Sequence, residues 1–218
     1  MTEKRKLLLS LPIPLFFIVV IWCVKLVEYA NNTSFYFLGV YPHSFKGIIG
    51  ILTAPLVHDD IKHLVNNSVP FLLFSVATFF FYRPLGLRVL FWVWLMSGLW
   101  VWFGARPAYH IGASGLVYGL GAFLFFSGAI RRNAHLAAVS LIVVFLYGSM
   151  IWGIFPFVPD ISWEAHLSGG IAGLILAIVY RKDGPQPKKY EWEDEENVDS
   201  SDVLIDKLEE NNSTPEKN

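Results

Sequence analysis

Long apolar stretches separated by short polar segments make up most of the chain. A transmembrane helix needs roughly 20 apolar residues to cross a hydrocarbon core about 30 Å thick. Six stretches satisfy this requirement, and we place them near residues 7–29, 61–82, 86–104, 112–130, 135–155 and 165–180. None has the wide polar face of a soluble amphipathic helix. The pattern therefore predicts an all-α membrane protein, built as a bundle of six transmembrane helices.

The composition agrees with a membrane protein and excludes several other classes. Of the 218 residues, 54% are hydrophobic and 16% are charged, and the mean hydropathy of +0.47 is too high for an ordinary soluble domain. The 18 Phe, 9 Tyr and 8 Trp residues exclude a disordered protein. The single cysteine, Cys23, excludes an intrachain disulfide framework and a cysteine-based zinc site.

The net charge of −1 conceals two oppositely charged parts. Residues 1–182 carry 13 Lys and Arg against 6 Asp and Glu, or +7, whereas residues 183–218 carry 4 against 12, or −8. We therefore divide the chain into a six-span membrane core, residues 1–182, and an acidic tail, residues 183–218, that we expect to be disordered. We expect the core to contact the lipid bilayer, and we expect no nucleic-acid partner.

Basic residues near the ends of the predicted spans indicate the orientation. With six spans, four clusters fall on one side, which should be the cytoplasm: Lys4, Arg5 and Lys6; Arg83 and Arg88; Arg131 and Arg132; and Arg181, Lys182, Lys188 and Lys189. The opposite loops carry only Lys46, Lys62 and Arg106, with Lys25 near the outer end of the first span. We thus expect a multi-pass protein of a bacterial plasma membrane with both termini in the cytoplasm. A cleaved signal peptide is the alternative for residues 1–30, but the long apolar run and the poor cleavage site at 28–30 favour an uncleaved span.

Polar side chains occur where three of the spans begin, although such groups are costly inside a membrane and usually mark function. They are His58, His63, Asn66 and Asn67 at the second span, Ser114 and Tyr118 at the fourth, and His166 and Ser168 at the sixth. In the predicted topology these three spans all run from outside to inside. The polar groups therefore belong to the outer half of the membrane.

Three of these groups come out at one depth. Ser114 is 17 residues before Arg131, Asn67 is 16 before Arg83, and His166 is 15 before Arg181. At 1.5 Å per residue these separations are about 25, 24 and 22 Å. A nucleophile, a base and a hydrogen-bond donor thus lie at one level.

Serine becomes a nucleophile when a neighbouring base takes its proton, and neutral imidazole can do so near pH 7. The oxyanion that develops needs donors, which an Asn amide, a His N–H and backbone N–H groups can supply. Glu164 lies two residues from His166 and faces elsewhere on a helix. The sequence therefore favours a Ser114–His166 dyad over a triad.

Small residues recur every four positions on the fourth and sixth spans. They are Gly115, Gly119, Gly169 and Gly173. Such faces let membrane helices approach closely. If the two faces meet, Ser114 and His166 come within hydrogen-bonding range, and Tyr118 lies at the level of the imidazole.

Three motifs resemble the signatures of rhomboid intramembrane serine proteases. They are Gly112-Ala113-Ser114-Gly115, His63-x-x-x-Asn67 and Ala165-His166-x-x-Gly169-x-x-x-Gly173. The resemblance implies that Ser114 is the nucleophile and His166 the base, that His63, Asn67 and the Ser114 N–H line the oxyanion hole, and that Tyr118 stacks on His166. His58 would match a further polar position in the outer loop.

The resemblance also implies an activity: cleavage of transmembrane segments of other membrane proteins near their outer end, without a metal or organic cofactor. Two departures stand out. The Trp-Arg pair that many bacterial members carry in the first outer loop is missing, and the chain has no seventh predicted span. It would be the minimal six-span form.

Three alternatives remain beside this reading. A metal site at His58, Asp59, Asp60 and His63 is disfavoured because the acidic residues suit a helix cap and no His-Glu-x-x-His pattern is present. A catalytically silent relative that binds transmembrane helices would normally lack the serine or the histidine. A small transporter would be expected to show inverted repeats, and we find none.

Overall fold

The computed structural model of the chain describes residues 2–131, 138, 141, 145, 152–157 and 161–184. Its α-helices are α1 (Glu3–Ser10), α2 (Pro12–Ala30), α3 (Gly50–Thr53), α4 (Ile61–Phe81), α5 (Gly86–Gly104), α6 (Ser114–Ile130) and α9 (Trp163–Val179). The short helical turns η1 (Tyr36–Leu38), η2 (Phe45–Gly47) and η3 (Ala54–Leu56) lie between α2 and α4. Within the described residues no β-strand is present. The predicted all-α membrane bundle is therefore confirmed for this part of the chain.

Five of the six predicted spans coincide with helices. The first, α1 with α2, runs from Glu3 to Ala30, and like α4 and α5 it is long and apolar enough to cross a membrane. The helices α6 and α9 are shorter, at 17 residues each. The predicted span 135–155 lies outside the described residues except at a few positions, as does almost all of the predicted tail 183–218.

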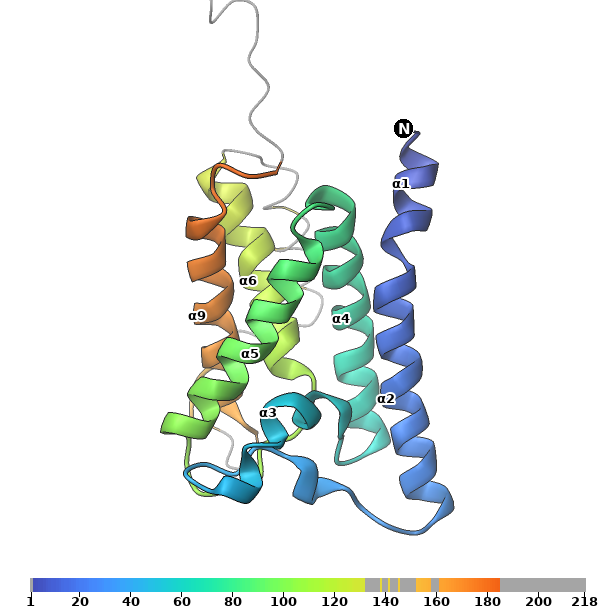
Figure 1. Cartoon of the computed structure of the whole chain (residues 1–218), viewed down its shortest axis with the longest axis vertical. Coiled ribbons are helices and arrows are strands. Elements are labelled where there is room, and N and C mark those ends of the chain that lie inside the picture. Colours follow the sequence, from blue (N-terminus) through green and yellow to red (C-terminus); the bar gives the residue numbers. More distant parts are fainter. Residues whose placement is uncertain are drawn as a thin grey trace, which may run out of the picture. The chain divides into compact units, whose positions relative to one another are not determined.

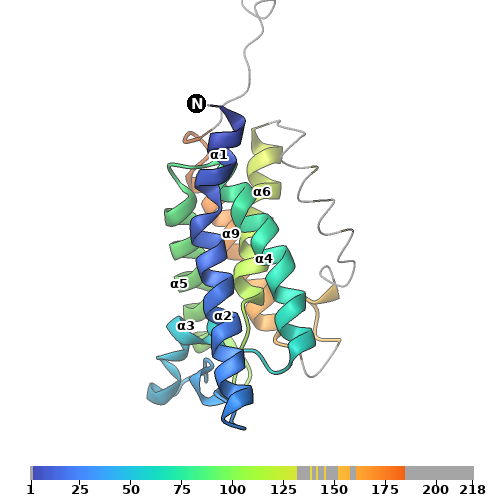
Figure 2. The same cartoon turned by 90° about the vertical axis from the view of Figure 1, so that its right-hand side faces the viewer.

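The central helix of the bundle is α6, which packs most extensively against α9 and also contacts α4 and α5 (Figures 1 and 2). Its residues Leu120 and Phe123 are fully buried, together with Phe71 and Phe74 of α4. On the other side of α4, Phe17 of α2 brings its ring centroid within 4.3 Å of Phe71. The order α2, α4, α6, α9 is therefore held by continuous apolar packing.

The helices α4, α6 and α9 all begin at the end of the bundle opposite the chain's N-terminus, next to the α2–α4 connection (Figure 1). His63 is in the first turn of α4, Ser114 is the first residue of α6, and His166 is in the first turn of α9. The fold thus places the three motifs at one end of the bundle.

Glycines allow α6 and α9 to touch backbone to backbone. A Cβ atom on Gly169 would collide with the carbonyl oxygen of Gly115, and one on Gly173 would collide with that of Gly119. The small faces predicted from the sequence therefore meet. This close contact sets the distance between the two helices at the level of Ser114 and His166.

Replacing Gly169 with alanine is expected to destabilise the protein by about 1–3 kcal/mol, the usual cost of overpacking. The obstacle is backbone, so the helices themselves must separate. Gly170→Ala is the matched control, because a Cβ atom there has nothing within 4 Å. Thermal unfolding in detergent would measure both, and equal melting temperatures would contradict the close-contact argument.

Candidate active site

The loop before α6 has a geometry that only glycine tolerates. Gly112 has φ of +105°, in the left-handed region that L side chains avoid. A Cβ atom there would also lie 2.7 Å from Nε2 of His63. The helix consequently begins at Ser114 rather than at residue 112, which corrects the predicted boundary of this span.

Two successive backbone N–H groups of this loop donate hydrogen bonds within the described part of the chain, and the third does not. Gly112 donates to the carbonyl of Ala54 at 2.9 Å, and Ala113 donates to Nε2 of His58 at 3.3 Å. The next N–H belongs to Ser114, and no acceptor among the described residues takes it. First-turn N–H groups lack a helical partner and carry the positive end of the helix dipole. The Ser114 N–H is therefore available to a negatively charged oxygen.

Ser114 directly precedes Gly115, whose backbone touches that of Gly169 on the helix that carries His166. Ser114 is 9% exposed. Tyr118, one turn further along α6, lies on the His166 ring with centroids 4.2 Å apart and planes at 9°. The structure thus brings Tyr118 and His166 into direct contact, as the sequence suggested. Among the described residues no hydrogen bond joins Ser114 to His166, in keeping with catalytic hydrogen bonds that are often long before substrate binds.

A backbone carbonyl fixes the orientation of His166. Its Nδ1 atom lies 2.7 Å from the carbonyl oxygen of Gly153, and the ring is 8% exposed. A carbonyl can only accept, so Nδ1 carries a hydrogen, and in the neutral ring Nε2 then keeps its lone pair. That tautomer can take a proton from a hydroxyl. The role of Gly153 could not be predicted from the sequence, because any residue supplies a carbonyl.

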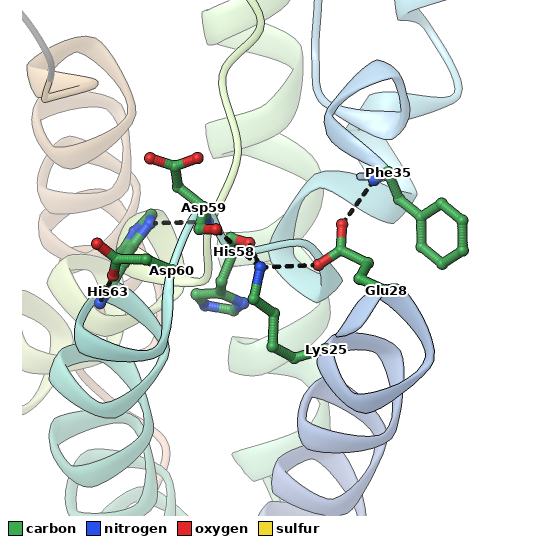
Figure 3. A network of polar contacts seen from close by, with 7 residues as sticks. All are labelled: Lys25, Glu28, Phe35, His58, Asp59, Asp60 and His63. Carbon is green, nitrogen blue, oxygen red and sulfur yellow. Dashed lines mark hydrogen bonds and ion pairs between the residues drawn. The ribbon is translucent and has the colours of Figure 1, made fainter. Parts of the chain in front are cut away.

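His63 is held in the opposite tautomer. The backbone N–H of Asp59 points to its Nδ1 atom at 3.4 Å, while its own backbone N–H donates to Oδ1 of Asp60 at 2.6 Å, which caps α4 (Figure 3). Because Nδ1 accepts, the ring hydrogen is on Nε2. That atom is the one nearest to Gly112, so His63 presents a neutral donor beside the loop that leads to Ser114.

Asn67 lies one turn after His63 on the same face of α4. Its side-chain nitrogen donates one hydrogen to the carbonyl of His63 at 2.9 Å, and the residue is 5% exposed. This nitrogen would lie 3.9 Å from a Cβ atom on Gly112. The second hydrogen of the Asn67 amide and Nε2 of His63 therefore both lie near the loop at Gly112.

His58 holds the loop before α6 through a hydrogen bond to the backbone N–H of Ala113. Burial lowers its pKa to about 3, assisted by His63 and Lys25, so the ring is neutral at physiological pH. Only a neutral ring can accept the Ala113 N–H at Nε2. His58 thus shapes the backbone immediately before Ser114, a contact that the sequence did not predict.

A second polar cluster anchors the start of α9. Ser162 is 2.6 Å from Nδ1 of His110, whose Nε2 is 3.0 Å from the carbonyl of Arg106. The side chain of Arg106 in turn pairs with Glu164 at 3.6 Å. Burial lowers the pKa of His110. Glu164 therefore pairs with Arg106, and no hydrogen bond joins it to His166 among the described residues.

The ten candidate residues fall into two groups. Ser114, Tyr118 and His166 lie at the α6–α9 contact, with Gly115, Gly169 and Gly173 at its centre, while His63, Asn67 and His58 surround Gly112 on the α4 side. Ser114 connects the two groups along the chain, because it comes two residues after Gly112 and directly before Gly115. The starts of α4, α6 and α9 thus bring a hydroxyl, an imidazole and several N–H donors to one end of the bundle.

Comparison with known proteins finds a matching family model and several related sequences. A family model described as the Rhomboid domain matches residues 46–183. An uncharacterized protein of Mycobacterium tuberculosis is 31% identical over 185 residues, which cover 79% of this chain and 75% of that protein. An uncharacterized protein of Mycobacterium leprae is 30% identical over 184 residues, which cover 79% of this chain and 71% of that protein. A putative rhomboid protein of Acanthamoeba polyphaga mimivirus is 25% identical over 65% of this chain and 78% of its own.

Proposed function

Because the chain belongs to the rhomboid family, we propose that it is an intramembrane serine endopeptidase with a Ser114–His166 dyad. The observation that carries the proposal is the state of His166. Its Nδ1 is committed to Gly153 and its face is covered by Tyr118. The basic Nε2 atom is then the one left for chemistry at the helix contact where Ser114 lies.

In the proposed reaction, Ser114 Oγ attacks the carbonyl carbon of a peptide bond while His166 Nε2 takes the hydroxyl proton. The imidazolium returns that proton to the leaving amine, and an acyl-enzyme remains. Water, deprotonated by the same nitrogen, then hydrolyses the ester and restores Ser114. The carbonyl of Gly153 accepts from Nδ1 throughout and favours the charged ring.

Stabilisation of the oxyanion falls to three N–H groups in this proposal. They are the backbone N–H of Ser114, Nε2–H of His63 and the second amide hydrogen of Asn67. All three surround the loop at Gly112. Preorganised donors of this kind act where charge develops and need no rearrangement during the reaction. His58 contributes by holding Ala113, and no cofactor is needed.

We further propose that the substrates are transmembrane segments of other membrane proteins, cut near their outer end. The basic residues of the chain support cytoplasmic termini, which puts the starts of α4, α6 and α9 at the outer side of a bacterial plasma membrane. The acidic tail, residues 183–218, remains a predicted disordered extension of the six-span core.

A fluorophosphonate probe tests the proposal. We expect detergent-solubilised protein to be labelled on Ser114, with mass spectrometry identifying the residue, because only an activated serine attacks the probe. Heat-unfolded protein is the control and should stay unlabelled. Absence of labelling in folded protein would instead favour the catalytically silent relative.

A further inference from the structure

A largely buried ion pair lies at the end of α2 that faces the α4 motif (Figure 3). Lys25 Nζ is 3.0 Å from Oε2 of Glu28, and the two side chains are 16% and 2% exposed. The other oxygen of Glu28 accepts the backbone N–H of Phe35 at 2.6 Å. Neither residue takes part in the proposed reaction.

The ammonium group of Lys25 has two further partners, both backbone carbonyls. They belong to His58, at 2.9 Å, and to Asp59, at 2.7 Å. With Glu28 these acceptors account for all three ammonium hydrogens. Lys25 therefore ties α2 to the turn that precedes α4.

One peptide group connects Lys25 to His63. The carbonyl of His58 accepts from Lys25, and the N–H of the same peptide unit, on Asp59, points to Nδ1 of His63. Hydrogen bonds in a chain polarise one another. The ammonium group that donates to the His58 carbonyl polarises the peptide and makes the Asp59 N–H a stronger donor. A stronger hydrogen bond at Nδ1 of His63 makes its Nε2–H a stronger donor in turn.

We propose that Lys25 is a positioning residue for the oxyanion side of the site: through the His58–Asp59 peptide it holds His63 in the tautomer that donates from Nε2 and strengthens that donor. The inference rests on the proposed function and deepens it. It makes the first span part of the catalytic arrangement, although no signature motif lies on that span. Its effect should appear in kcat, because oxyanion donors act on charge that develops in the transition state.

The test is a double-mutant cycle between Lys25 and His63, with cleavage of a transmembrane substrate measured in liposomes. We expect Lys25→Met to lower kcat about tenfold with KM unchanged, well below the 10²–10³ loss for removing a donor outright. In a His63→Ala background the same change should lower kcat less than about twofold. Lys62→Met is the matched control, because Lys62 is an exposed lysine next to His63 in the first turn of α4 and its replacement removes the same charge.

A second variant allows for poor folding. Lys25→Met leaves Glu28 buried without its partner, which is destabilising, so Lys25→Met with Glu28→Gln removes both charges and keeps an oxygen for the Phe35 N–H. It should show the same loss of kcat per active site, counted by fluorophosphonate labelling. A purely structural role for Lys25 predicts equal losses with and without His63, and that result would overturn the proposal.

The outcomes also separate this inference from the proposed function. Wild-type protein that is labelled and cleaves substrate, together with Lys25 variants of unchanged kcat, would reject the role of Lys25 alone. Wild-type protein that is neither labelled nor active would reject both. Losses confined to KM would also count against the inference, because they indicate a role in binding substrate.

Discussion

Ser114→Ala is expected to abolish proteolysis while the protein inserts and folds normally. Removing the nucleophile closes the covalent route, which in serine proteases costs on the order of 10⁶ in kcat. The stability should hardly change, because one hydroxyl is lost from a contact already built of small residues and no hydrogen bond of the Ser114 side chain is recorded in the described structure. Cleavage of a transmembrane substrate in liposomes measures the first effect, and thermal unfolding measures the second.

Ser75→Ala is a suitable control for this experiment. Ser75 is fully buried in the bundle, and its hydroxyl lies within hydrogen-bonding distance of the carbonyls of Phe71 and Leu72 within α4. This variant should keep wild-type kcat. Ser114→Ala protein that still cleaves at the wild-type rate would remove the basis for a serine mechanism, whatever the family of the chain.

Much of the helical framework could be predicted because membrane spans depend on length and apolarity alone. The predicted span 86–104 coincides with α5, and the start predicted at residue 61 is that of α4. The start of α6 was predicted two residues early. The positive φ of Gly112 keeps this residue in the loop before the helix, and hydropathy carries no information about a backbone angle.

The residues of the candidate site could be predicted where their side chains are polar, but the contacts made by backbone atoms could not. Serine, histidine and asparagine stand out in apolar helices, so the candidates could be named and their common level estimated. Two backbone groups favour opposite tautomers: the carbonyl of Gly153 for His166 and the N–H of Asp59 for His63. Neither group depends on the type of its residue, so the sequence does not indicate it. Lys25 was visible only as a charge near the end of the first span. Its partners come from 33 and 34 residues further along the chain.

His63→Ala and Asn67→Ala should each lower kcat about 10²–10³-fold, the usual effect of losing one oxyanion donor. Both variants keep the nucleophile, the base and the Ser114 N–H, so activity falls by degrees instead of disappearing. KM should move little, since the donors act mainly on charge formed in the transition state. Steady-state kinetics in liposomes, normalised to active sites, would measure these effects.

Asn66→Ala is the matched control, because this neighbouring asparagine is exposed while Asn67 is buried. It should retain wild-type kcat. A competing explanation is structural, since Asn67 also donates to the carbonyl of His63 and His63 accepts from Asp59. Thermal unfolding separates the two explanations. If the loss of activity only matches the loss of folded protein, or if Asn67→Ala keeps wild-type kcat, the oxyanion role of that residue is wrong, because a donor that acts on the transition state must change the rate of the folded enzyme.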